Sequence, residues 1–248
     1  GIDGGVFRAT EGLWQRYGGA RVRDTPLSEA AIAGVSVGLA AQGFRPVAEI
    51  QFQGFVHPAL DQMANHAARM RNRTRGRLTC PMVLRAPYGG GVHAPEHHSE
   101  SIEALFAHIP GLKVVIPSSP ARAYGLLLGA EALPLERAFT LRAGGGLTLV
   151  TWGASVREAA AAAETLAAEG IEAEIIDLAT LRPCDIEAVL GSVRRTGRCL
   201  ILHEAPRTGG FGAEIAARVA EEAIDSLLAP VRRVTAPDIV PPLPRRED

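Results

Sequence analysis

Residues 147–178 read LTLVTWGASVREAAAAAETLAAEGIEAEIIDL, and this stretch decides the fold class. It begins and ends with short apolar runs, which predict two buried strands. Between them, Ser155 and Glu158 have the spacing of a capping box, and Gly170 follows the last residue with helical periodicity. A strand, a helix and a strand in this order are typical of a parallel sheet covered by helices.

The same alternation extends over the rest of the chain and predicts an α/β protein with two α/β domains. Expected strands cover residues 46–51, 82–85, 112–116, 147–152, 174–178, 200–203 and 231–235, and expected helices cover residues 26–43, 60–67, 101–108, 155–170 and 212–228. The flexible run Ala143-Gly144-Gly145-Gly146 interrupts the pattern. We therefore predict a first domain over residues 1–142 and a second over residues 147–248.

The composition is that of an ordinary globular protein: 47% of the 248 residues are hydrophobic, 21% are charged, and the net charge is −1. A near-neutral chain with 5% aromatic residues gives no reason to expect nucleic acid or an anionic membrane as a partner. Cys80, Cys184 and Cys199 are far apart and form no CxxC pair. Without a secretory signal or a membrane-spanning run, the chain is expected to be cytoplasmic, with small, buried and reduced cysteines.

Six strings resemble the beta subunits of thiamine-diphosphate-dependent 2-oxo acid dehydrogenases. They are GGVFRATEGL (4–13), RVRDTPLSEAAIAG (21–34), RPVAEIQFQGF (45–55), PGLKVVIPSSP (110–120), SVRRTGR (192–198) and HEAPRTGGFGAEIAA (203–217). They lie in the family's order and cover nearly the whole chain, which is far more specific than one short motif. The resemblance implies a transketolase pyrimidine-type domain followed by a transketolase C-terminal-type domain.

The resemblance also implies an activity and partners. Family members decarboxylate pyruvate or a branched-chain 2-oxo acid and transfer the acyl group to a lipoyl group on a transacylase core. They work as α2β2 heterotetramers, in which the alpha subunit holds the diphosphate of the cofactor and its magnesium. This chain has no GDG-then-Asn magnesium motif, in agreement with a site shared with an alpha subunit, and we assign it no metal ligand.

The chain departs from the family in three places. A strand and a helix that precede Gly1 in the family are absent, a few tens of residues are missing between Ala130 and Leu135, and the end at residues 241–248 comes before the family's last helix. Two explanations account for these gaps: either the gene product is truly shortened, or segments were omitted from the sequence. We favour the second explanation, because a domain without a core strand would expose backbone groups that need partners.

Glu29 matches the family's cofactor-activating glutamate. Such a carboxyl group contacts the aminopyrimidine ring and favours the tautomer that removes the proton from the thiazolium carbon. Glu29 begins an expected helix with no further charge before Arg45, so it enters an apolar wall, where burial favours a shared proton. On the residues alone, an acid that complements the helix dipole in the first turn is the favoured interpretation. The resemblance reverses this preference and implies the catalytic role.

Phe55 matches the family's aromatic residue that packs on the aminopyrimidine, although a core phenylalanine has the same sequence signature. Gln51 and Phe52 lie at the end of the expected strand over residues 46–51. Ligands of α/β proteins usually bind at strand ends, and side-chain alternation allows one of the two to face the cofactor. Gln51, Phe55 and Glu29 are therefore the predicted cofactor contacts.

His98 matches a family histidine that faces the active-site channel and assists acyl transfer to the lipoyl group. An imidazole titrates near neutral pH, so it can give or accept a proton there. The neighbouring His93, Glu96 and His97 invite a metal interpretation, but the spacing lacks the HExxH register, which favours a solvent-facing loop. Glu100 stands where the family commonly has glutamine and adds a charge near His98.

Two rival functions remain open on the sequence. A fragment of a transketolase or deoxyxylulose-phosphate synthase would carry a GDG motif upstream in the same gene. A shortened, non-catalytic paralogue that acts in complex assembly would have an intact reading frame from Ala130 to Leu135. The family's potassium site would use carbonyl groups near Met82 and Ala130, and because the sequence after Ala130 departs from the family, we assign no potassium ion.

Overall fold

A computed structural model describes residues 2–127 and 134–241, apart from the side chains of Tyr124 and Leu127. Residues 128–133, which include Ala130, and residues 242–248 lie outside the described part of the chain. The sequence departs from the resembled family in both of these regions. The chain divides into two compact units, Gly1–Pro87 (unit 1) and Tyr88–Asp248 (unit 2).

Unit 1 is built around a pair of parallel strands, in which Val47 lies opposite Val83. The helix α2 packs against this pair and against the turns that follow it, and it buries Ala33, Val37 and Ala40. Ser28 precedes the helix, and its hydroxyl makes no capping bond. The elements of unit 1 are α1 (Leu13–Tyr17), α2 (Glu29–Ala41), β1 (Val47–Glu49), η1 (Gln53–Phe55), η2 (His57–Ala59), η3 (Gln62–Ala67), α3 (Met70–Arg73) and β2 (Val83–Arg85).

The helix expected over residues 60–67 has an unusual form. Two 3₁₀ turns, η1 and η2, lead into it, and η3 is a π-helical turn that closes with a bond from the Ala68 N–H to the Met63 carbonyl at 2.9 Å. Pro58 lies at the start of η2, where the N–H that proline lacks would have no helical acceptor. Single π-helical turns are frequent at functional sites, and this one follows Phe55.

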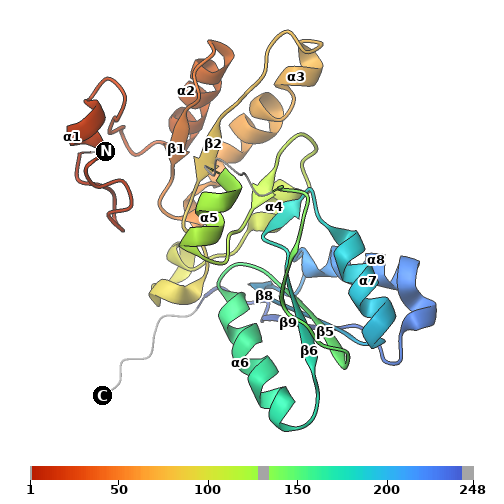
Figure 1. Ribbon diagram of the computed structural model, residues 1–248. Helices are drawn as coiled ribbons and strands as arrows, with labels where there is room; N and C mark the ends of the chain where they lie inside the picture. Colours follow the sequence, from red (N-terminus) through yellow and green to blue (C-terminus); the bar gives the residue numbers. More distant parts are fainter. Residues whose placement is uncertain (1, 128–133, 242–248) are drawn as a thin grey trace, which may run out of the picture. The chain divides into compact units, whose positions relative to one another are not determined.

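Unit 2 contains a five-stranded sheet in the order β4-β6-β5-β8-β9. Strands β5, β6, β8 and β9 are parallel, and β4 pairs antiparallel with β6 at the edge. Helix α6 covers one face, and α7 and α8 cover the other (Figure 1). The elements are η4 (Gly90–Val92), η5 (Glu96–His98), α4 (Glu103–Ala107), β3 (Val114–Val115), α5 (Pro120–Leu127), β4 (Phe139–Arg142), β5 (Leu147–Thr151), α6 (Ser155–Ala168), β6 (Ala173–Asp177), β7 (Thr180–Arg182), α7 (Ile186–Thr196), β8 (Cys199–Pro206), α8 (Gly212–Ala223), η6 (Ile224–Ser226) and β9 (Arg232–Ala236).

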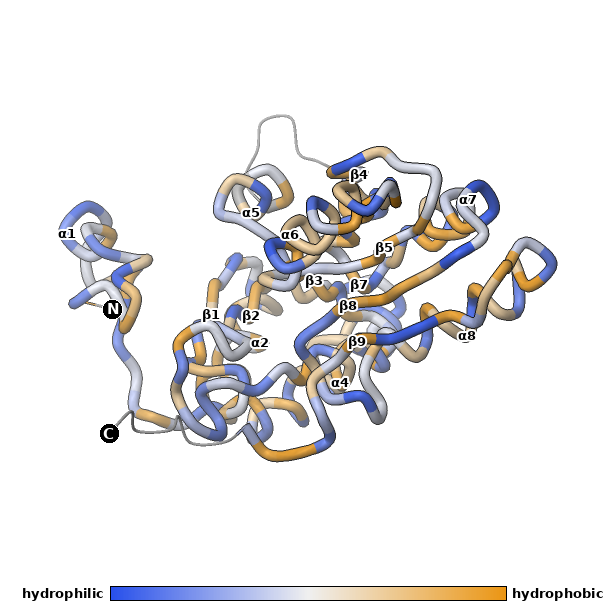
Figure 2. The backbone as a smooth tube through the Cα atoms, turned by 90° about the horizontal axis from the view of Figure 1, so that it is seen from below, coloured by the Kyte–Doolittle hydropathy of each residue, from blue (hydrophilic) through white to orange (hydrophobic). Residues whose placement is uncertain are grey.

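The hydrophobic core of unit 2 lies on both faces of this sheet. Every residue of β6 is buried, as expected for a parallel strand between two helical layers. One face carries the larger cluster, with Val150 and Ile201 packed against Val189 of α7 and Ile215 of α8. Hydrophobic and hydrophilic residues alternate along α7 and α8 (Figure 2), and the buried residues include Val189 and Val193 of α7 and Ile215 and Val219 of α8.

Three features of unit 2 differ from the sequence expectations. Ser155 is the first helical residue of α6 and is buried, while Ala154 occupies the cap position, so the expected capping box does not form. Strand β7, which has only three residues, was not anticipated. Helix α7 was missed although Ile186, Val189 and Val193 have helical spacing and Asp185 caps the helix. Finally, β3 pairs with β7, a contact between residues on the two sides of the glycine run 143–146 that the sequence did not indicate.

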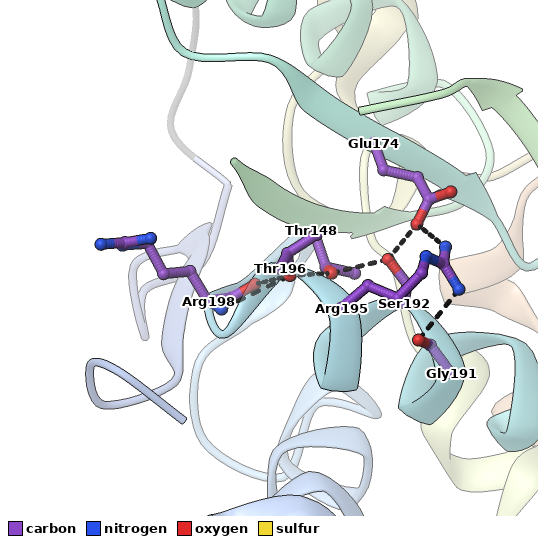
Figure 3. A network of polar contacts seen from close by, with 7 residues as sticks. All are labelled: Thr148, Glu174, Gly191, Ser192, Arg195, Thr196 and Arg198. Atoms are coloured by element: carbon purple, nitrogen blue, oxygen red, sulfur yellow. Dashed lines mark hydrogen bonds and ion pairs between the residues drawn. The ribbon is translucent and has the colours of Figure 1, made fainter. Parts of the chain in front are cut away.

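A buried polar network ties α7 to the amino end of β5 (Figure 3). The Thr148 hydroxyl bonds to the Ser192 hydroxyl at 2.6 Å and to the Thr196 hydroxyl at 2.7 Å. Ser192 also donates to Glu174 of β6, which accepts a bond from Arg195 at 2.5 Å. Each of the three hydroxyls in this network therefore has a partner, as a packed interior requires.

Replacing Thr148 by valine keeps the shape of the side chain and removes the hydroxyl shared by Ser192 and Thr196. We expect the free energy of unfolding to fall by about 1–2 kcal/mol, because two buried hydroxyls each lose a partner. Urea denaturation measures the change. The control is Thr165→Val on the exposed face of α6, expected within about 0.5 kcal/mol of wild type. Equal effects of the two substitutions would show that the network contributes no net stability.

Candidate functional site

Glu29 is the first residue of α2 and is half-buried. Its carboxylate makes no hydrogen bond or ion pair with any residue that the structure describes. The rest of α2 carries no charge. A half-buried carboxylate without an internal partner is available to a ligand or to a partner chain.

Gln51 follows β1, and its amide is held by the chain itself. It donates a hydrogen bond from Nε2 to Glu49 Oε1 at 2.5 Å, and Glu49 Oε2 pairs with Arg85 Nε at 3.1 Å. Gly5 lies beside this group, since a Cβ there would come within 2.9 Å of Gln51 Nε2. The strand end thus carries a chain of polar groups, of which the sequence analysis had identified Gln51 alone.

Phe55 ends the turn η1 and is half-buried, whereas the preceding Phe52 is buried and its ring meets that of Phe7 edge-on at 5.6 Å. Phe52 is therefore a core residue of unit 1, and Phe55 is the aromatic side chain with an accessible surface. Helix α2 packs against η2, the turn that follows Phe55 directly. Glu29, Gln51 and Phe55 all belong to unit 1, and His98 belongs to unit 2.

His98 lies in η5, within a loop whose two ends meet. The Gly89 N–H donates to the Glu100 carbonyl at 3.0 Å, which closes the loop like the stem of an Ω-loop. Inside the loop, the Ser99 hydroxyl donates to the Ala94 carbonyl. His98 is half-buried, while His93 and His97 are exposed, as the loop interpretation predicted.

The stem of this loop contacts the end of β8. The Gly90 N–H donates to Glu204 Oε2 at 3.0 Å, and the other oxygen, Oε1, is buried without a hydrogen-bond partner among the described residues. A Cβ at Gly89, which has φ +85°, would lie 2.4 Å from Glu204 Oε2. Glycine is therefore required at position 89 by both the backbone conformation and the closeness of the carboxylate.

Further ionisable groups surround the stem. Glu103, at the start of α4, is 1% exposed and accepts a bond from Trp152 Nε1 at 3.3 Å. Burial, with the nearby Glu204 charge adding to it, raises the pKa of Glu103 above its usual range. Burial and the same two carboxylates raise the pKa of Tyr88. Its hydroxyl lies against Gly153, where a Cβ would be 1.8 Å away.

His203 is the second buried residue of this region that the sequence analysis missed. It is 2% exposed, its ring stacks on Trp152 at 4.9 Å, and neither ring nitrogen has a partner in the described part of the chain. Gly210 and Gly212 make room for the ring, since a Cβ at either would come within 2.8 Å of it. Burial lowers the pKa of His203 to about 4, so the imidazole is neutral at physiological pH.

A pocket of about 820 Å³ lies elsewhere in unit 2, between α4, β7 and the first half of α8. Its walls include Lys113, Arg182, Arg218 and Cys184, and none of the predicted site residues lines it. Burial raises the pKa of the Cys184 thiol to about 12, so it is no nucleophile at neutral pH. No cluster of three or more His, Cys, Asp or Glu side chains suited to a metal ion occurs among the described residues.

Two family matches cover this fold in order. Residues 2–142 match the transketolase pyrimidine-binding domain, and residues 136–247 match the transketolase C-terminal domain. Proteins named pyruvate dehydrogenase E1 component subunit beta align with the entire chain. The protein from Acholeplasma laidlawii is 46% identical over 274 residues, and that from Bacillus subtilis is 45% identical over 274 residues. The chain belongs to the transketolase-like family of pyruvate dehydrogenase E1 beta subunits.

The alignments cover all of this chain and 84% of each of those two beta subunits. They span more residues than the 248 of this chain, as expected if the family members contain segments that are missing here. Among solved structures, a split-gene transketolase described as an inactive beta4 tetramer superposes with a TM-score of 0.75 over 91% of this chain and 78% of its own, at 24% identity. That likeness confirms the predicted transketolase-type α/β fold. None of the described helices has the length and apolar character needed to cross a bilayer.

The neutral, buried His203 makes the stability of this beta subunit depend on pH. Its folded pKa of about 4 lies below the unfolded value of about 6.5, so the unfolded state binds the proton first as the pH falls. We expect stability to be complete above pH 6.5 and to fall between about pH 6.5 and 4, by on the order of 3 kcal/mol.

Urea denaturation of wild type and His203→Phe across this pH range tests the assignment. Phenylalanine keeps a ring against Trp152, and we expect it to flatten the pH dependence, whereas His66→Gln, which removes an exposed imidazole, should leave it. The same slope in wild type and His203→Phe would contradict the assignment.

Proposed function

We propose that this chain is the beta subunit of a thiamine-diphosphate-dependent pyruvate dehydrogenase and works with an alpha subunit in an α2β2 heterotetramer. Its relatives carry that name, and the half-buried, partnerless carboxylate of Glu29 supports the same assignment. The reaction is decarboxylation of pyruvate followed by acyl transfer to a lipoyl group on a transacylase core. The three free cysteines fit a reducing compartment, which for this chain is the cytoplasm.

The residues of unit 1 fit the pyrimidine half of the cofactor. Thiamine diphosphate, when bound, supplies the electron sink for cleavage of the bond between the carboxyl and carbonyl carbons. Glu29 would hold a proton against a ring nitrogen of the aminopyrimidine, because its carboxylate has no competing partner among the described residues. Phe55 would pack against the ring. Gln51, held by Glu49, would border the same strand end.

A chain that provides only the pyrimidine half of the cofactor site needs a partner subunit for the diphosphate half. The chain shows no magnesium motif, and the diphosphate with its magnesium would be held mainly by the alpha subunit. Unit 1 also exposes large apolar side chains on α2, β1 and β2, including Val35, Leu39, Val47 and Val83. Clustered apolar exposure of this kind is typical of a surface that another subunit covers.

His98 is the proposed acid–base residue for acyl transfer. It lies on a closed loop and is half-buried, so its position is restrained while one side stays accessible. An imidazole can donate a proton to the developing lipoyl thiol and recover it afterwards.

Glu29→Gln in the reconstituted tetramer should slow hydrogen–deuterium exchange at the thiazolium carbon by about 100-fold or more, because the amide cannot share the proton. NMR of quenched samples measures the exchange. Glu158→Gln is the matched control, since Glu158 also lies in the first turn of a helix, α6. Normal exchange in Glu29→Gln would remove Glu29 from the mechanism.

His98→Ala should slow reductive acylation of a free lipoyl domain by about 100-fold. Decarboxylation measured with ferricyanide as the electron acceptor should fall much less, because the lipoyl step is bypassed. His97→Ala changes the adjacent exposed imidazole and should leave both rates near wild type. A His98→Ala enzyme that acylates lipoyl domains at the wild-type rate would exclude the proposed role.

A further inference from the structure

The five-stranded sheet of unit 2 reverses its winding between β5 and β8. From β5 the chain passes through α6 to β6 on one side, then through α7 to β8 on the other side of β5. Helices α6 and α7 consequently cover opposite faces (Figure 1). In α/β proteins, the carboxyl ends of the strands at such a reversal form the crevice in which ligands bind.

In this domain the chain's own glycine loop meets both strand ends at the reversal. At the end of β5, the Tyr88 hydroxyl lies against Gly153, where a Cβ would be 1.8 Å away. At the end of β8, Glu204 Oε2 accepts a hydrogen bond from the Gly90 N–H at 3.0 Å. The carboxyl ends of β5 and β8, where other α/β domains bind a ligand, therefore contact residues 88–90 of the chain itself.

The contact reaches His98 through short, directional bonds. Glu204 holds Gly90, and the adjacent Gly89 N–H donates to the Glu100 carbonyl at 3.0 Å, two residues after His98. A carboxylate acceptor makes a stronger bond to a backbone N–H than a neutral oxygen does. Removing it would leave the Gly90 N–H without its acceptor, so the loop stem has a specific dependence on this one side chain.

We propose that Glu204 is a positioning residue, which fixes the stem of the His98 loop on the carboxyl edge of the C-terminal-type sheet. The role of His98 itself rests on the proposed function above. The two contacts that fix the loop stem, Gly90 to Glu204 and Gly89 to Glu100, both lie within unit 2. The carboxyl edge of the C-terminal-type sheet thereby contributes to the geometry of acyl transfer.

Hydrogen–deuterium exchange of the full chain, followed by mass spectrometry, tests the position directly. Glu204→Ala should speed exchange in peptides covering residues 88–101 by about tenfold or more, as expected for loss of a bond to a charged group. Peptides from β5 and β6 should keep wild-type protection. Glu204→Gln retains a carbonyl oxygen that can accept from Gly90 and should restore most of the protection.

A pair of glycine substitutions supplies the matched control. In Gly89→Ala the new methyl group would collide with Glu204, and we expect the same loop exchange as in Glu204→Ala. In Gly91→Ala the methyl group meets no atom within 4 Å, and exchange should match wild type. Unchanged loop protection in Glu204→Ala, or an equal rise across β5 and β6, would overturn the positioning role.

Activity separates this inference from the proposed function. In the reconstituted tetramer, Glu204→Ala should lower lipoyl acylation at least tenfold while proton exchange at the thiazolium carbon stays at the wild-type rate. Glu204→Gln should recover much of the acylation. A wild-type tetramer without that proton exchange would contradict the proposed function, whereas wild-type acylation by Glu204→Ala would contradict the positioning role.

Discussion

Strand β5 is enclosed on both faces and both edges, and the rest of unit 2 is arranged around this constraint. β6 and β8 pair with its two edges, and helices cover its two faces. A parallel strand in this position has no route to water except at its ends. Polar side chains therefore gather at the two ends of β5. The two ends differ in how far these side chains satisfy one another by hydrogen bonds.

At the amino end, hydroxyl groups satisfy one another. Thr148, Ser192 and Thr196 form a closed set, with Glu174 and Arg195 at its margin (Figure 3). At the carboxyl end, Glu103 and His203 are buried near the half-buried Tyr88 and Glu204, and several polar atoms of this group have no partner in the described chain. The polar network at the amino end stabilises the fold. The buried polar atoms without partners at the carboxyl end are typical of functional regions.

Unit 1 is arranged by a different constraint. Its described residues form a two-stranded parallel pair, which leaves apolar side chains of α2, β1 and β2 exposed. Glu29 lies at the start of this helix, half-buried and without an internal partner among those residues. Glu29 has no partner within the described chain, and the apolar surface is not covered by it. An active site shared between two kinds of subunit would require both features.

The sequence by itself determined the fold class, the order of the two domain types and the family, because strand and helix periodicities and long family strings are local properties of the chain. It also named Glu29, Gln51, Phe55 and His98 as candidates; each is half-buried, and their roles stay predictions. The failed capping box at Ser155 shows the limit of such reasoning, since packing of Ser155 into the core outweighed the local pattern.

Only the tertiary structure decided which distant residues share an environment. Glu204 lies 106 positions after His98 in the sequence numbering, and nothing in its neighbourhood HEAP indicates a contact with a glycine loop. The pairing of β3 with β7 and the burial of His203 beside Trp152 have the same origin. Such contacts arise where strands of a parallel sheet end together, because residues far apart in the chain then meet at one edge.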